Sequence, residues 1–152
     1  MSSYPYKIYC DMDGVLCNFE KGAIEAINRE LASKNPKNPK LAASVIEDLG
    51  RNYVTVDDIQ KFSPGKSSAA TKYMYRLAHD DVDFWANLEW QPGGKQLWAY
   101  IRQFDPDILT SPMDKQGHNE SLEGKLIWVE RNLGLSPDRV NFAHDKYKFA
   151  VS

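Results

Sequence analysis

The sequence has 152 residues, of which 42% are hydrophobic and 26% are charged, with only nine Gly and eight Pro. This composition excludes collagen-like, low-complexity and wholly disordered chains and predicts a soluble globular domain. The formal net charge of −2 disfavours a surface that grips duplex nucleic acid through many phosphates. A single local pocket for an anionic ligand remains compatible with this charge.

The first residues and the cysteines bear on the cellular compartment. Only two cysteines occur, Cys10 and Cys17, both beside apolar residues, and with three scattered histidines they show no zinc-ligand spacing. Residues 1–7 lack the apolar core of a signal peptide, and no run approaches the roughly 18 apolar residues of a membrane span. We therefore expect a cytoplasmic protein with neither a disulfide framework nor a membrane contact.

The first forty residues predict a strand, a helix and a loop. Residues 6–10 are rich in β-forming side chains and run into the polar turn Asp11-Met12-Asp13-Gly14, which is typical of a buried strand. From residue 18 to about 32 an apolar side chain recurs every fourth position, which predicts an amphipathic helix. The polar stretch 33–40 contains two prolines and predicts a loop.

The rest of the chain divides into a helical part and an alternating part. Short helical patterns without an evident strand cover 41–49, 56–62 and 69–78. After a turn at 91–94, the patterns predict in order a helix around 97–104, a strand at 108–109, a helix over 122–133 and a strand at 140–143.

This order predicts an α/β fold with a Rossmann-like parallel sheet and helices on both of its faces. Residues 1–32 and 91–152 would form the core. Residues 33–90 are too many for a connecting loop and would form a small helical cap, inserted after the first strand and helix.

Polar side chains follow each predicted strand, where ligands bind in open parallel sheets. They are Asp11 and Asp13, then Thr110 and Ser111, then Lys146. Two carboxylates, two hydroxyls and an ammonium group suit a phosphate monoester together with a divalent cation such as Mg²⁺. One carboxylate can attack phosphorus and the second can move the proton, while hydroxyls and lysine hold the phosphate oxygens.

Each segment also has a plainer interpretation. Asp11-Met12-Asp13-Gly14 could be a solvated turn, and Thr110-Ser111 an ordinary strand exit capped by hydroxyls. Lys146 could be a surface lysine. A calcium loop would place Glu20 at the twelfth position, but Tyr9 would then stand where the first carboxylate ligand belongs.

The segment from Ile8 to Leu16 resembles the first motif of the haloacid dehalogenase superfamily. Within that superfamily, the order and spacing of several segments are similar to the 5'(3')-deoxyribonucleotidases. These segments are 11–19, 84–85 followed by 91–93, 108–112, 125–133 and 144–146. The resemblance covers both ends of the chain and is weak between about residues 32 and 83.

The resemblance implies that Asp11 is the nucleophile, forming an aspartyl-phosphate, and that Asp13 is the general acid and base. The Asp11 carboxylate and the Asp13 backbone carbonyl would bind Mg²⁺. Thr110 and Ser111 would contact the phosphate, and Lys146 would neutralise it.

The resemblance also matches Phe19 to an aromatic residue of the family's nucleoside pocket, although Phe19 could equally be a core residue of the first helix. Trp85 and Trp90 are more readily interpreted as core or hinge packing than as platforms for a base. The family continues after the lysine with a strand ending in an Asp-Asp pair, and the sequence ends at Ser152 before such a strand. We interpret this either as a shortened version of a longer protein or as a natural remnant with weakened Mg²⁺ affinity.

Together these observations predict a Mg²⁺-dependent phosphatase whose substrate is a nucleoside monophosphate, with deoxyribonucleotides favoured. An alternative is a phosphatase of the same chemistry that acts on another small phosphomonoester. A second alternative, from a different class, is a non-catalytic module that binds a nucleotide or a partner protein.

Overall fold

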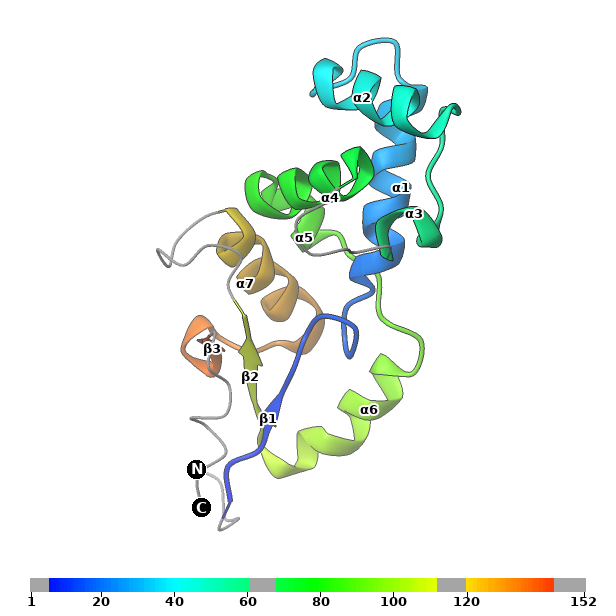
Figure 1. The fold of residues 1–152 in the computed structure, drawn as a ribbon. Coiled ribbons are helices and arrows are strands. Elements are labelled where there is room, and N and C mark those ends of the chain that lie inside the picture. The colour runs from blue at the N-terminus through cyan, green and yellow to red at the C-terminus, as the bar shows by residue number, and fades with distance from the viewer. Residues whose placement is uncertain (1–5, 61–67, 112–119, 144–152) are drawn as a thin grey trace.

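The computed structural model describes residues 6–60, 68–111 and 120–143 of the chain (Figure 1). The helices in this part are α1 (Phe19–Ala32), α2 (Pro39–Leu49), α3 (Val56–Gln60), α4 (Ala69–Asp80), α5 (Val82–Ala86), α6 (Gly94–Ile101) and α7 (Glu120–Leu133). The strands are β1 (Tyr9–Cys10), β2 (Asp107–Thr110) and β3 (Val140–Phe142), and the 3-10 turns are Arg102–Phe104 and Pro137–Arg139.

Within the described residues the strands form one parallel sheet in the order β1-β2-β3. Cys10 pairs with Ile108 across the first ladder, and Ile108 pairs with Val140 across the second. Ile108 therefore lies at the centre of the sheet, where it is fully buried. Two parallel neighbours need a crossover between them: the chain from β1 to β2 includes α1 to α6, and the chain from β2 to β3 includes α7.

The α/β class and the parallel sheet predicted from the sequence are confirmed. The first strand is shorter than predicted, since only Tyr9–Cys10 has a paired partner in β2. The sequence pattern missed α5, because the polar residues 79–81 resemble a plain linker. In the structure α4 continues through this stretch, and the Asp81 side chain accepts a hydrogen bond from Phe84 N at 3.1 Å and caps α5.

The carboxyl ends of β1 and β2 point toward the helices α1, α4 and α5 (Figure 1). Helix α1 is tied to the predicted insert by Asn28, whose side-chain amide donates to Val54 O at 3.2 Å and accepts from Val54 N at 2.7 Å. The division into a 33–90 cap and a separate core, and the placement of helices on both faces of the sheet, remain predictions.

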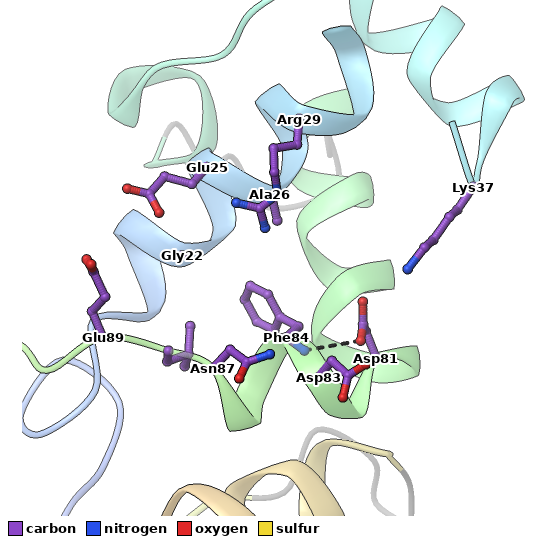
Figure 2. A pocket seen from close by; sticks show the side chains of 11 residues that line it. Gly22, Glu25, Ala26, Arg29, Lys37, Asp81, Asp83, Phe84, Asn87 and Glu89 are labelled. Carbon is purple, nitrogen blue, oxygen red and sulfur yellow. Dashed lines mark hydrogen bonds between the residues drawn. The ribbon is translucent and has the colours of Figure 1, made fainter. Parts of the chain in front are cut away.

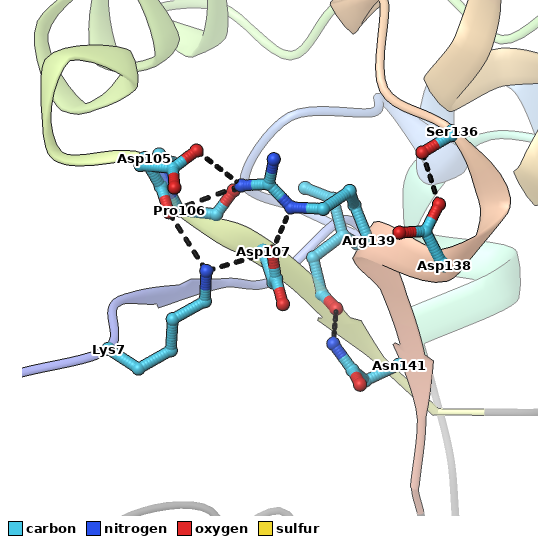
Figure 3. Close-up of polar contacts among 9 residues, drawn as sticks. Lys7, Asp105, Pro106, Asp107, Ser136, Asp138, Arg139 and Asn141 are labelled. Carbon is cyan, nitrogen blue, oxygen red and sulfur yellow. Dashed lines mark hydrogen bonds and ion pairs between the residues drawn. The ribbon is translucent and has the colours of Figure 1, made fainter. Parts of the chain in front are cut away.

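The opposite end of the sheet is held by a cluster of charges (Figure 3). The Arg139 guanidinium donates to the carboxylates of both Asp105, at 2.7 Å, and Asp107. Lys7 adds an ion pair to Asp107 at 3.0 Å and a hydrogen bond to Asp105 O at 3.0 Å. Residues just before each of the strands are thus joined at the amino end of the sheet, away from the predicted site.

Candidate functional site

The two aspartates after β1 lie on a tight turn that the backbone closes on itself. The carbonyl of Met12 accepts hydrogen bonds from the N–H groups of Val15, Leu16 and Cys17, at 2.8 to 3.1 Å. Gly14 has a φ of 76°, a conformation that glycine adopts without steric cost. Asp11 Oδ1 accepts from Met12 N at 2.8 Å, which fixes the direction of this carboxylate.

A second segment, far away in the sequence, holds the turn in place. Asn18 N donates to Glu89 O at 2.9 Å, and Gln91 N donates to Leu16 O at 2.8 Å. A Cβ on Gly94 would lie 3.1 Å from the Leu16 carbonyl oxygen, so a residue without a side chain lets α6 start against the turn. The segment 89–94, between α5 and the start of α6, therefore holds the turn that carries the two carboxylates.

The functional groups after β1 and β2 converge on the side chain of Lys125 from α7. Its ammonium group donates to Thr110 Oγ1 at 2.9 Å and to Ser111 O at 2.8 Å. It also lies 3.3 Å from Asp13 Oδ2, within ion-pair distance. A lysine ammonium has three N–H donors, and here three oxygens are available to accept them.

Lys125 is fully buried, which is unusual for a lysine and requires partners of this kind. Burial lowers the pKa of Lys125, and the negative charges of Asp13 and Asp11 act in the opposite direction. The site therefore combines a buried cation with carboxylates at the open end of β1. The Asp13 side chain is 36% exposed overall, with Oδ2 facing the lysine and Oδ1 buried.

The structure brings together Asp13, Thr110 and Ser111, as the sequence predicts, and places Asp11 at the same end of the sheet. Lys146 lies outside the described residues. The calcium-loop alternative is wrong, because the segment before the aspartates is strand β1 and pairs with β2, whereas a calcium loop follows a helix.

Phe19 lies beside the site without contacting Lys125 in any described interaction. It is half-buried and packs on Trp85, with ring centroids 5.2 Å apart, and on Phe84 at 5.6 Å. Both interpretations of Phe19 thus stay open, since it joins the core while part of its surface remains accessible. Trp85 is 1% exposed and belongs to the core. Trp90 is half-buried and packs edge to face against Trp128, with ring centroids 5.0 Å apart, so neither tryptophan is an open platform.

Lys125 is a residue of the site that the sequence patterns did not predict. The apolar pattern of this helix comprises Leu122, Leu126, Val129 and Leu133; Val129 is buried, whereas the three leucines are only half-buried. The residues of α7 that are buried in the structure are Ser121, Gly124, Lys125, Trp128 and Val129. Lys125 precedes Trp128 by three residues and Val129 by four, so the three side chains share one face of the helix, and Lys125 also follows a glycine. This spacing was the signal in the sequence for a cation on the buried face.

The two cysteines lie close to the aspartates but are not placed to act as nucleophiles. Both are buried and free. Burial, with a smaller effect from Asp11, raises the pKa of Cys10 to about 11. Burial and the charge of Asp13 also raise the pKa of Cys17. Both therefore remain neutral thiols at pH 7.

A cavity of about 290 Å³ lies between α1 and α5, and its lining does not include Asp11, Asp13, Thr110, Ser111 or Lys125. Figure 2 shows the Arg29 side chain directed from α1 toward the ring of Phe84. Several of the acidic side chains that line the cavity already have partners within the protein. Asp81 caps α5, and Glu25 and Glu89 pair with Lys21. Because Phe84 contacts Trp85 at 5.5 Å, the aromatic cluster separates this cavity from Lys125.

Among the described residues, the cluster of His79, Asp80 and Glu120 has potential metal-ligand atoms within 4.8 Å of one another. It lies on the surface, and Asp80 is already paired with His79 at 2.6 Å and with Arg76 at 3.3 Å. The carboxylate charge is thus balanced without a metal. In the described part of the chain, no helix has the length and apolar character of a membrane span.

The chain is similar in sequence to a curated nucleotidase. The chain is 32% identical over 139 residues to a protein of Mus musculus named "5'(3')-deoxyribonucleotidase, mitochondrial". The aligned region covers 88% of this chain but 55% of that protein, so the chain spans about half the length of this curated relative. The similarity supports a relationship to nucleotidases. No model of a protein family matches the chain.

Proposed function

We propose that this chain carries the catalytic centre of a haloacid dehalogenase-type phosphatase that hydrolyses nucleoside monophosphates, with deoxyribonucleotides preferred. The observation that carries the proposal is the convergence of Asp13, Thr110 and Ser111 on the buried ammonium of Lys125. The nucleotidase-like relative supports the choice of a nucleotide over other phosphomonoesters.

In the proposed reaction, a carboxylate oxygen of Asp11 attacks phosphorus, and the bond from phosphorus to the sugar oxygen breaks. The leaving oxygen takes a proton from the Asp13 carboxyl group. A water then attacks the aspartyl-phosphate, Asp13 takes a proton from it, and inorganic phosphate leaves with Asp11 restored. Both aspartates thus end each cycle as they began.

Thr110 and Lys125 would hold the phosphate. Because Thr110 Oγ1 accepts from Lys125, its own hydrogen can be donated to a phosphate oxygen. A bound phosphate dianion would compete with Asp13 for the ammonium of Lys125, which lies 3.3 Å from that carboxylate. Loosening this pair would make it easier for Asp13 to take up the proton that it must donate. Lys146 remains the second cation proposed for the phosphate.

The donor set fits Mg²⁺, which binds through hard oxygen ligands and often uses only one or two carboxylates besides water and substrate phosphate. Asp11 and the backbone carbonyl of Asp13 are the residues proposed to hold it. When bound, Mg²⁺ supplies positive charge that screens the repulsion between the attacking carboxylate and the phosphate.

The test is release of phosphate from dUMP and dTMP by the 152-residue chain, with and without Mg²⁺. Ribonucleoside monophosphates and sugar phosphates serve as competing substrates. Asp11→Asn should abolish turnover, since the amide is a far weaker nucleophile. Asp57→Asn is the matched control, because Asp57 is an exposed carboxylate on α3 and should leave turnover unchanged.

Turnover that survives in Asp11→Asn would contradict the covalent mechanism. Faster hydrolysis of sugar phosphates than of nucleotides would replace the proposed substrate with another small phosphomonoester. Binding of dUMP without any Mg²⁺-dependent turnover would instead support the non-catalytic alternative.

A further inference from the structure

The ammonium group of Lys125 has a fourth neighbour besides its three oxygen acceptors. Its Nζ lies 4.5 Å from the centroid of the Trp85 ring. Cations within about 6 Å of an aromatic face are attracted by the negative charge above the ring, and tryptophan is the strongest such partner. The attraction is larger where water is excluded, and both side chains are at most 1% exposed here.

Trp85 itself is held firmly. Its indole Nε1 donates to Ala78 O at 2.7 Å, which ties the ring to the end of α4. The rings of Phe19 and Phe84 pack against it at 5.2 and 5.5 Å. The ring therefore has a fixed orientation before any ligand arrives.

The residue before the lysine allows this approach. A Cβ added to Gly124 would lie 2.5 Å from Trp85 Cβ and 2.6 Å from the carbonyl oxygen of Val82. Both distances are shorter than real Cβ contacts, so only glycine lets α5 come this close to α7. The close packing brings the Trp85 ring face to the ammonium group.

We propose that Trp85 is a positioning residue, whose ring face holds the Lys125 ammonium against Asp13 and Thr110 so that it is preset for a phosphate. This inference rests on the proposed function for the identity of the ligand. On this proposal, Trp85 of α5, which lies in the chain between α1 and β2, aligns the Lys125 ammonium group of α7. A ligand that contacts Phe19 would touch the same aromatic cluster that aligns the lysine.

The first test does not depend on catalysis. In protein labelled with ¹³C-lysine, the ring current of Trp85 should shift the ε-methylene protons of Lys125 upfield of those of exposed lysines. Lys125→Met assigns the signal by its loss. Trp85→Phe should keep an upfield shift, and Trp85→Leu should lose it. A wild-type Lys125 signal among the exposed lysines would overturn the proposal.

The second test uses phosphate. Trp85→Leu should raise the KM for dUMP and the Kd for inorganic phosphate by about ten-fold, with a smaller change in kcat. Trp85→Phe should restore most of the affinity, because it keeps an aromatic face. Trp128→Leu is the matched control: Trp128 is also fully buried on α7, and its Nε1 donates to Leu88 O at 2.8 Å. It should lower stability without raising KM.

The outcomes separate the two proposals. If the wild-type chain hydrolyses dUMP and Trp85→Leu leaves KM and Kd unchanged, the positioning role is refuted and the proposed function stands. If the wild type has no turnover but the Lys125 signal shows the ring-current shift, the positioning geometry stands and the proposed function fails. A KM raised equally by Trp128→Leu would refute the positioning role, because a general loss of packing would then explain the effect.

Discussion

Gly124→Ala tests the packing on which the site depends. In a helix interior alanine is favoured over glycine by about 1 kcal/mol, so propensity alone predicts stabilisation. The new Cβ would lie 2.5 Å from Trp85 Cβ and 2.6 Å from Val82 O, and neither atom is the far end of a flexible side chain. Moving the first contact from 2.5 Å to an ordinary 3.4 Å requires α5 to shift by about 0.9 Å.

Overpacking of this kind costs about 1 to 3 kcal/mol, and two contacts place Gly124 at the upper end of that range. After the gain in helix propensity, the free energy of unfolding should fall by about 2 kcal/mol. For a chain of 152 residues this lowers Tm by about 4 to 8 °C. Urea denaturation followed by tryptophan fluorescence, together with a thermal melt, measures both quantities.

Gly22→Ala is the matched control, because Gly22 also lies in a helix and its added Cβ would also meet a neighbour closely. That neighbour is Leu88 Cδ2, and the remaining contacts are at 3.7 Å or more. A leucine methyl group can rotate away, so the clash and the gain in propensity should nearly cancel. A Gly124→Ala protein as stable as wild type, or more stable, would refute the close approach of α5 and α7.

Three further substitutions test hydrogen bonds and ion pairs described above. Arg139→Gln should cost about 2 kcal/mol at pH 7. Burial raises the pKa of Asp107, but hydrogen bonds from Arg139 and Lys7 outweigh it and hold this pKa below 3.8; the stabilisation is therefore present above that value and is lost in more acidic solution. The cost of Arg139→Gln should consequently be smaller at pH 3 than at pH 7 in urea titrations, and an equal cost at both would contradict this account. Asn28→Leu should cost about 3 kcal/mol in the same assay, since it leaves both backbone groups of the buried Val54 without their amide partner; a cost below about 1 kcal/mol would mean that water replaces the amide. The Lys125→Met protein should still fold, with its free energy of unfolding lowered by about 1 to 3 kcal/mol, because the variant removes the desolvation cost of the ammonium but leaves Thr110 Oγ1 and Ser111 O without their donor. Calorimetry should nevertheless show inorganic phosphate binding weakened by more than about ten-fold, and unchanged binding would remove Lys125 from the site.

The sequence alone determined the elements whose patterns are local. The parallel strands followed from short apolar runs that alternate with helices, and Asp11, Asp13, Thr110 and Ser111 followed from their places after those runs. Parallel strands place their carboxyl ends at one edge, so residues almost a hundred positions apart could be grouped without coordinates. The roles assigned to them, the Mg²⁺ site and the contribution of Lys146 remain predictions.

Only the tertiary structure decided which cation meets these groups. A lysine in a helix is ordinarily exposed, and within the apolar pattern of α7 only Val129 is fully buried while the leucines are half-buried. Lys125 is turned inward because Gly124 admits Trp85 and because three oxygens from two other segments accept its hydrogen bonds. These contacts depend on how helices pack in space. The spacing of Lys125 to Trp128 and Val129 puts these residues on one face of α7, but no local pattern gives the distance between α5 and α7, and so the position of the central charge of the site became visible only in the fold.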